Sequence, residues 1–282
     1  MAVDHERGGD GTAGLILEAE VPLGPSTGRP SAPLDRASLF GIQFDLLTAQ
    51  ELRTWVGAVL TGPAETRHIA FSNSEFVLEA RRNERLRRYL NGCSLNLVDG
   101  IGVVYAFRLM TGIRPPERLS GTNFVAMLCD EAAAAGARLF LFGARPGVAT
   151  RAAAALERRT PGLQICGAVD GFAGAHDVLE QIRAAAPDVL MVCLGNPLQE
   201  RWVEEHIGEL DLKLVWGAGG ALDFYSGDVP LAPGWVQRGG LEWLFRLVTN
   251  FSVARLRRQL GLIELVGLVV RGRLRRARRR RR

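Results

Sequence analysis

Short apolar runs alternate with stretches of helical periodicity along most of the chain. The runs are rich in β-branched or aromatic residues, and the stretches between them, such as VATRAAAALERR and VLEQIRAAAP, are rich in alanine. The runs lie at 68–73, 94–100, 138–144, 163–169, 188–195 and 213–220. Strands and helices that alternate in this way form βαβ units, in which helices cover both faces of a parallel sheet. The pattern predicts an α/β fold with a Rossmann-like parallel sheet.

The two ends of the chain differ from this body. Residues 1–36 are rich in Gly, Pro, Ser and charge, so we expect a disordered leader. Residues 37–245 form the predicted α/β domain, whose first helix starts with a capping box of Thr48 and Glu51. Residues 246–282 are predicted to form a basic helical appendage.

Polar residues and glycines follow the apolar runs. They are Asn73, Asp99-Gly100, Gly143, Asp170-Gly171, Gly195-Asn196-Pro197 and Gly217-Ala218-Gly219-Gly220. Open α/β sheets bind ligands at the carboxyl ends of their strands, where glycines let a phosphate approach the backbone. A strand-to-helix turn also needs glycine for its geometry alone. The whole set points to a nucleotide or another phosphorylated ligand.

The charge is placed unevenly. The 282 residues have a formal net charge of +5, and nearly all of the 35 basic residues are arginines. The segment after Asn250 holds twelve arginines and one acid, Glu264, so it carries +11 and leaves −6 for the rest of the chain. A mildly acidic body excludes a basic groove that covers the whole domain.

Cysteine usage and the N-terminus favour a cytoplasmic protein. Cys93, Cys129, Cys166 and Cys193 form no CxxC pair and are expected to be buried free thiols. The start of the chain, MAVDHERGGDGTAG, lacks the basic and then apolar order of a secretory signal. No stretch reaches eighteen uncharged apolar residues, so no transmembrane helix is expected.

Three longer stretches carry an ordered series of motifs. They are NLVDGIGVVYAFRLMTGIRPPERLSGTNF at 96–124, CLGNPLQERW at 193–202, and WGAGGALDFYSGDVPLAPGWVQRGGLEWLFRL at 216–247. With the FLFGxxPGV turn, this series resembles the WecG/TagA/CpsF family of bacterial glycosyltransferases from about residue 40 to 250. The resemblance implies inverting transfer of a sugar from a UDP-sugar to a polyprenyl-diphosphate-linked sugar. Such a step belongs to the synthesis of teichoic acid, common antigen or exopolysaccharide at the inner face of the plasma membrane.

Inverting transfer needs a base for the acceptor hydroxyl and positive charge for the departing diphosphate. Asp99 ends an apolar run and coincides with the family's candidate base, although an aspartate there can also cap the next helix. Arg118 matches the family's arginine in PERLSG, and its alternative is a surface pair with Glu117. The chain contains no Asp-x-Asp motif, so we predict neither a metal nor a cofactor.

Further residues are expected to bind substrate. Gln199 offers an amide to sugar hydroxyls or to the uracil edge, and the neighbouring Glu200 has capping of its helix as an alternative to a binding role. Asp223 offers a carboxylate to ribose, and its alternative is a structural role. The appendage is expected to contribute arginines to the site. The full predicted set is Asn73, Gly100, Thr122, Asn123, Gly143, Gly195, Asn196, Gln199, Gly217, Gly219, Gly220, Asp223, Arg246, Arg255 and Arg258.

The chain departs from the family pattern at several positions. Phe71 stands where the family usually has threonine, and Leu231 stands where it commonly has arginine. The proline that follows GLEWLxRL is replaced near Phe251, and Arg255 and Arg258 come two residues late. These changes leave the donor sugar and the tail arginine that enters the site undetermined.

The tail can form an amphipathic helix, with Leu256, Leu260, Ile263 and Val270 near one stripe. Arginines near an anionic leaflet contribute roughly 1 kcal/mol each, so we expect peripheral membrane attachment. A solvated charge run and nucleic-acid binding are the alternatives for the tail.

Two other functions are the alternatives for the whole chain. One is a nicotinamide- or flavin-dependent enzyme, although the chain lacks GxGxxG after its first apolar run, and the other is a non-enzymatic adaptor. Self-association is left open.

Overall fold

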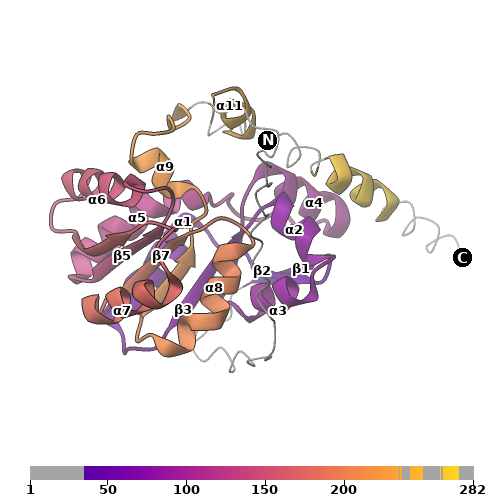
Figure 1. Cartoon of the computed structure of the whole chain (residues 1–282). Coiled ribbons are helices and arrows are strands. Elements are labelled where there is room, and N and C mark those ends of the chain that lie inside the picture. Colours follow the sequence, from indigo (N-terminus) through magenta and orange to yellow (C-terminus); the bar gives the residue numbers. More distant parts are fainter. Residues whose placement is uncertain (1–34, 235, 237–241, 250–260, 262, 273–282) are drawn as a thin grey trace, which may run out of the picture.

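The computed structural model describes residues 35–234, 236, 242–249, 261 and 263–272 (Figure 1). The strands are β1 (Arg36–Leu39), β2 (Ile42–Asp45), β3 (Arg67–Ser72), β4 (Leu95–Val98), β5 (Arg138–Gly143), β6 (Gln164–Val169), β7 (Val189–Cys193) and β8 (Leu214–Gly217). The helices are α1 (Ala49–Thr61), α2 (Ser74–Ala80), α3 (Glu84–Gly92), α4 (Ile101–Thr111), α5 (Gly121–Ala135), α6 (Val148–Arg159), α7 (Ala175–Ala185), α8 (Leu198–His206), α9 (Ala221–Tyr225) and α11 (Glu242–Thr249), with a 3-10 turn at Ile207–Glu209. A further helical segment lies at 263–272.

The eight strands form one sheet in the order β1-β2-β4-β3-β8-β7-β5-β6. Each of the six predicted runs overlaps one of the strands β3 to β8, and all pairs among these six strands are parallel. The α/β prediction is therefore confirmed. The antiparallel hairpin of β1 and β2 at one edge is an addition that the apolar pattern did not predict.

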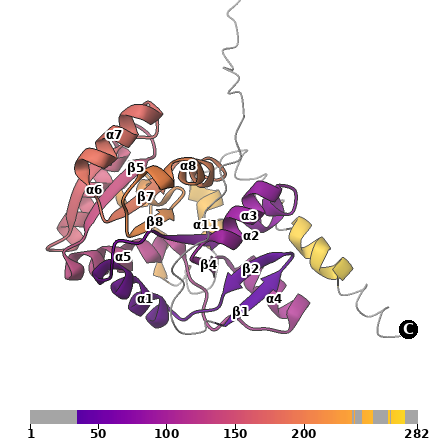
Figure 2. The same cartoon turned by 90° about the horizontal axis from the view of Figure 1, so that it is seen from below.

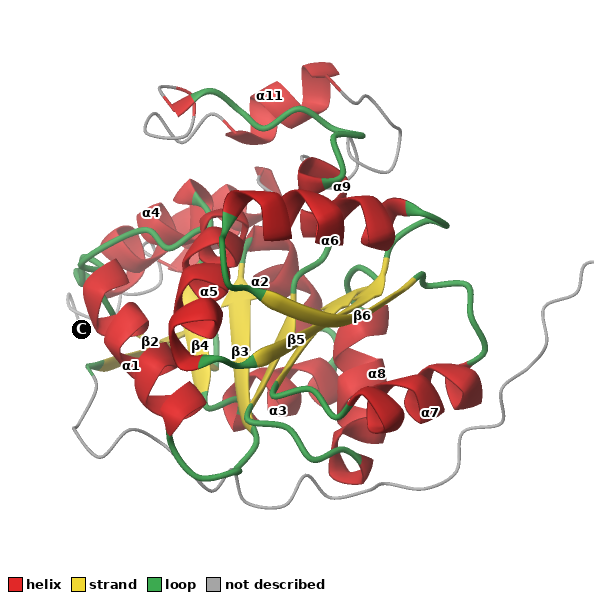
Figure 3. Ribbon diagram, turned by 90° about the vertical axis from the view of Figure 1, so that its left-hand side faces the viewer, coloured by secondary structure: helices red, strands yellow, loops and turns green. Residues whose placement is uncertain are grey.

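Helices cover both faces of the sheet, as predicted (Figures 2 and 3). One core contains buried side chains from α2, α3, α4, α7 and α8, and the other contains those from α1, α5, α6 and α9. Successive strand residues alternate between the two cores: Phe140 and Phe142 belong to the first, and Leu139 and Leu141 to the second. Burial on both sides explains why the runs are continuously apolar instead of alternating with polar residues.

The described part of the predicted appendage is also helical. The helix at 263–272 buries Leu265 and Val269 in the first core, and Glu264 forms an ion pair with Arg82 at 2.6 Å. Gly272 lies against Met110 of α4, so this helix runs beside the body. Within the predicted stripe, Ile263 and Val270 are exposed, whereas Leu256 and Leu260 lie outside the described residues.

A buried polar network attaches the hairpin to the sheet. Asn96, fully buried in β4, accepts a hydrogen bond from Ser72 Oγ at 2.6 Å and donates Nδ2 to the Gln43 carbonyl at 2.8 Å. Its backbone N–H donates to the Asp45 carboxylate at 2.9 Å, and this carboxylate also accepts from Arg36 Nε at 2.6 Å. The network satisfies polar groups that would be costly to bury unpaired.

We predict that Asn96→Ala lowers the free energy of unfolding by about 2–4 kcal/mol, because it leaves buried polar partners without hydrogen bonds. Urea denaturation measures the change. Asn91→Ala is the control, since Asn91 also bonds to the hairpin, at Gln43 N–H and the Gly41 carbonyl, but only half-buried. We expect a loss below about 1 kcal/mol there. Equal losses in the two variants would contradict the role assigned to the buried network.

Candidate active site

The predicted site residues follow parallel strands that end at the same edge of the sheet. From β4 across β3, β8 and β7 to β5, these ends carry in turn Asp99, Asn73, the turn at 217–220, Gly195-Asn196 and Gly143. Strands that point the same way bring these ends together although the residues are far apart in sequence. The sheet order therefore assembles the strand-end residues along one edge.

Asp99 and Asn73 lie at adjacent strand ends. The backbone N–H of Asp99 donates to the Ser72 carbonyl at 3.2 Å, and the Asp99 side chain is half-buried. Gly100 has φ +82°, a conformation that favours glycine, and a Cβ atom placed there would lie 3.9 Å from Asn73 Cβ. Asn73 Oδ1 accepts the N–H groups of Glu75 at 2.9 Å and Phe76 at 3.2 Å. The Asn73 side chain thus caps α2, with its amide group close to the turn of Asp99.

The amino end of α5 lies over the ends of β3 and β8. A Cβ atom on Gly121 would lie 3.5 Å from the Trp216 ring and 3.7 Å from that of Phe71. Phe71, in the family's threonine position, is buried with its ring centroid 5.0 Å from that of Phe124. An aromatic support thus replaces the expected hydroxyl beneath this helix end.

Three of the predicted residues lie in the first turn of α5 or just before it. Arg118 is half-buried, as is Thr122, whose carbonyl accepts from Tyr225 Oη at 3.2 Å; Asn123 is exposed. The neighbouring Glu117 accepts the Ala49 N–H at 2.7 Å and so helps to cap α1. The first turn of α5 contains no acidic residue, so the helix offers its partly positive amino end to an anion.

Gln199 and Glu200 are buried in the first turn of α8, and both contact the turn after β8. Gln199 Nε2 donates to Glu200 Oε1 at 2.5 Å, and Gln199 Oε1 accepts the Gly219 N–H at 2.8 Å. Burial raises the pKa of the Glu200 carboxyl to about 7. The sequence alone did not indicate the burial of Glu200.

The glycines at this edge have different environments. A Cβ atom on Gly143 would lie 2.4 Å from the Cys193 carbonyl carbon, so close strand packing by itself requires glycine there. Gly195 and Gly219 have positive φ and nothing within 4 Å of an added Cβ atom, whereas Gly220 faces Asp223. Asn196 is half-buried, and its Oδ1 is buried without a hydrogen-bond partner among the described residues. Ligand contacts by these residues stay predictions.

Asp223 lies in a cluster of charged side chains whose other members, Arg145, Arg151 and Asp228, the sequence analysis did not predict. Its Oδ1 is 3.7 Å from Arg145 Nη2, which also pairs with Asp228 at 3.1 Å. Arg151 of α6 donates to Asp228 at 2.7 Å, and this bond lowers the pKa of Asp228. Arg145 and Arg151 are exposed cations beside the predicted ribose-binding carboxylate. The sequence feature that could have indicated these two arginines is GARPGVATR, which begins at the end of a predicted strand.

The remaining predictions concern the arginines of the tail, the cysteines, a metal site and membrane-spanning helices. Arg246 is placed on α11 without a described side chain, and Arg255 and Arg258 lie outside the described residues. The four cysteines are free thiols, three of them buried, and burial raises the pKa of the Cys129 thiol to about 12. The described residues hold no group of three or more His, Cys, Asp or Glu side chains that could bind a metal. No helix among them is long and apolar enough to cross a membrane.

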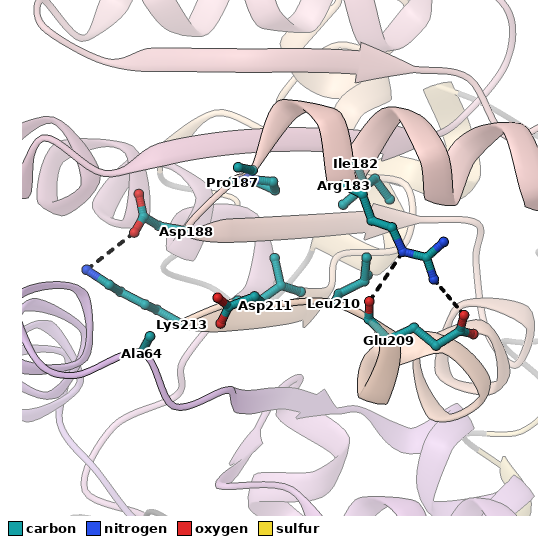
Figure 4. Close-up of a pocket in the computed structure, with 11 residues that line it drawn as sticks. Ala64, Ile182, Arg183, Pro187, Asp188, Glu209, Leu210, Asp211 and Lys213 are labelled. Carbon is teal, nitrogen blue, oxygen red and sulfur yellow. Dashed lines mark hydrogen bonds and ion pairs between the residues drawn. The ribbon is translucent and has the colours of Figure 1, made fainter.

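A pocket lies at the opposite edge, beside the amino ends of β7 and β8 (Figure 4). Its lysine, Lys213, donates to the Leu60 carbonyl at 2.8 Å and lies 3.3 Å from Asp188. Arg183 pairs with Glu209 at 2.7 Å. These two cations already have acidic partners within the protein, and none of the predicted site residues lines the pocket.

Comparison with known proteins agrees with the motif series. The sequence model of the glycosyl transferase WecG/TagA/CpsF family matches residues 37–279. An N-acetylglucosaminyldiphosphoundecaprenol N-acetyl-beta-D-mannosaminyltransferase of Bacillus spizizenii is 34% identical over 203 residues, which cover 72% of this chain and 78% of that protein. The Bacillus subtilis (strain 168) protein of the same name is 33% identical over 183 residues, covering 64% and 71%. The chain belongs to the WecG/TagA/CpsF family of glycosyltransferases.

Proposed function

We propose that the protein transfers a sugar from a UDP-sugar to a polyprenyl-diphosphate-linked sugar, with inversion at the anomeric carbon. The observation that carries this proposal is the placement of Asp99 beside Asn73, on the edge that also holds the turn at 217–220. The two Bacillus relatives are named for transfer to N-acetylglucosaminyldiphosphoundecaprenol, which supports a lipid-linked acceptor here. The donor is then a sugar nucleotide, and UDP-N-acetylmannosamine is the first to test.

The reaction is a single displacement. The acceptor hydroxyl gives its proton to the Asp99 carboxylate while its oxygen bonds to the anomeric carbon of the donor. The bond from that carbon to the diphosphate oxygen breaks, and UDP leaves from the opposite face. Arg118 and the amino end of α5 stabilise the diphosphate charge, and Asn73 orients the sugar. Asp223 binds the ribose beside Arg145.

Asp99→Asn should lower kcat by about 10²–10⁴-fold, because an amide cannot accept the hydroxyl proton. Transfer to a short polyprenyl-diphosphate sugar measures the loss. Asp170→Asn is the matched control, since Asp170 follows β6 at the same edge and accepts the Phe172 N–H at 2.9 Å. Its activity should stay near that of the wild type. Undiminished transfer by Asp99→Asn would contradict the mechanism.

Arg118→Ala should lower kcat by about 10²-fold, the usual effect of removing one group that stabilises charge in the transition state. Because side chains and a helix end supply the positive charge, transfer should continue at the same rate in EDTA. Arg158→Ala, at an exposed position near the end of α6, is the control. Loss of activity in EDTA that Mg²⁺ restores would show that a metal carries this charge instead.

We also propose that two adjacent helices present an apolar surface to the membrane. Tyr105, Leu109 and Ile113, along and just beyond α4, are exposed, as are Ile263, Val266 and Val270 on the helix at 263–272. The two helices meet at Met110 and Gly272. The exposed arginines Arg108, Arg114 and Arg271 flank this surface and suit an anionic leaflet. A bilayer contact here would bring a lipid-linked acceptor towards Asp99, which lies just before α4.

Replacing Ile263, Val266 and Val270 together by serine should reduce cosedimentation with anionic vesicles at least about ten-fold, because it removes apolar area that would enter the interface. Substitution is a cleaner test than truncation, since Leu265 and Val269 belong to the core. Phe172→Ser, at an exposed apolar residue beyond β6, is the control and should not change binding. Equal binding by the triple variant would contradict this membrane surface.

A further inference from the structure

A buried carboxyl group lies next to the proposed donor site without belonging to the proposed chemistry. Glu200, in the first turn of α8, is 5% exposed, and its neighbour Gln199 is 2% exposed. Acidic side chains are rarely buried this far unless a specific contact holds them. The two side chains face the turn at 217–220, which follows β8.

Hydrogen bonds connect the carboxyl to the backbone of that turn. Glu200 Oε1 accepts from Gln199 Nε2 at 2.5 Å, and Gln199 Oε1 accepts from the Gly219 N–H at 2.8 Å. The carboxamide has one accepting and one donating end, so the group that faces Glu200 fixes the group that faces Gly219. An ionised Glu200, which can only accept, places Gln199 Oε1 towards the turn.

The turn and the carboxyl also touch directly. A Cβ atom on Gly217 would lie 2.8 Å from Gln199 Nε2 and 3.1 Å from Glu200 Oε1. Any side chain at position 217 would push these two residues away. The absence of a side chain there lets the buried amide reach the backbone of the turn.

The second carboxyl oxygen of Glu200 is buried and has no hydrogen-bond partner among the described residues. Burial raises the pKa of Glu200 to about 7, and the nearby Glu75 of α2 raises it further. The groups that face it from α3 are Tyr89 and Cys93, neither of them a cation, and Arg85 of α3 pairs instead with Glu204 and Glu205 on α8. The hydrogen bond from Gln199 opposes this shift.

We propose that Glu200 is a positioning residue, whose ionised carboxylate orients the Gln199 carboxamide and thereby holds the turn at 217–220 in the form that binds the nucleoside diphosphate of the donor. When Glu200 is protonated, its O–H competes for Gln199 Oε1 and the amide rotates. Gln199 Nε2 then faces the Gly219 N–H, two donors oppose each other, and the turn is released. The assignment of a donor to this turn rests on the proposed function.

The conformation of the turn at 217–220 should depend on pH in one direction. The competent form is the ionised one, so the turn is held above pH 7 and released below it. Between pH 8 and pH 6 the ionised fraction of a group with a pKa of about 7 falls about ten-fold. Glu200→Gln carries a neutral group that, like the protonated carboxyl, has a donor beside its accepting oxygen and does not titrate, so it should leave the turn released at every pH.

Two measurements on the full chain test the proposal, namely the Gly219 amide resonance without ligand and the Kd for UDP, each from pH 5.5 to 8.5. In the wild type we expect the resonance to titrate near pH 7 and the affinity for UDP to fall about ten-fold from pH 8 to pH 6. Glu200→Gln should abolish the titration of the Gly219 resonance and, like Glu200→Ala, should bind UDP weakly at every pH. Glu205→Gln, on the exposed side of the same helix, is the matched control and should behave as the wild type.

The outcomes separate this inference from the proposed function. A Gly219 resonance that does not titrate, or that titrates equally in Glu200→Gln, would overturn the link between the carboxyl and the turn. UDP binding that is independent of pH in the wild type would overturn the positioning role. A titrating Gly219 in a protein that binds no UDP at any pH would instead count against the proposed donor, while supporting the link itself.

Discussion

The common direction of the strands from β4 to β6 is the constraint on which the rest of the structure depends. Neighbouring parallel strands all end at one edge, so residues as distant in sequence as Asn73 and Gly219 belong to one surface. The inner strands are buried on both faces, so their ends are where polar side chains can meet solvent. The same geometry points the start of α5 towards that edge, where an anion would meet its N–H groups.

Close packing at this edge sets the local chemistry. Gly143 and Gly217 lie where any side chain would collide with a neighbouring strand or with α8, so the strand ends approach one another closely. Such closeness excludes water around Glu200 and raises the pKa of its carboxyl. Arg145 and Arg151 are exposed, and Arg118 is half-buried. The edge therefore combines a dry carboxyl-amide pair with exposed cations, an arrangement suited to a sugar diphosphate.

Much of this organisation could be predicted from the sequence, because strand and helix periodicity are local signals. The six parallel strands and the capping box at Thr48 and Glu51 were confirmed. The hairpin was missed because its short strands, RASL and IQFD, mix polar with apolar residues and depend on the buried bonds of Asn96 and Asp45. The burial of Glu200 was missed for a similar reason, since its environment comes from α2, α3 and β8, which the sequence does not place together.

The proposed reaction requires that the carboxyl edge of the sheet binds the sugar nucleotide. Hydrogen–deuterium exchange of the full chain with and without UDP tests it most directly. We expect slower exchange in peptides that contain residues 99–101, 118–123 and 217–221, at the ends of β4 and β8 and the start of α5. Slower exchange confined to residues 183–188 and 209–213, which line the pocket at the opposite edge, would contradict it.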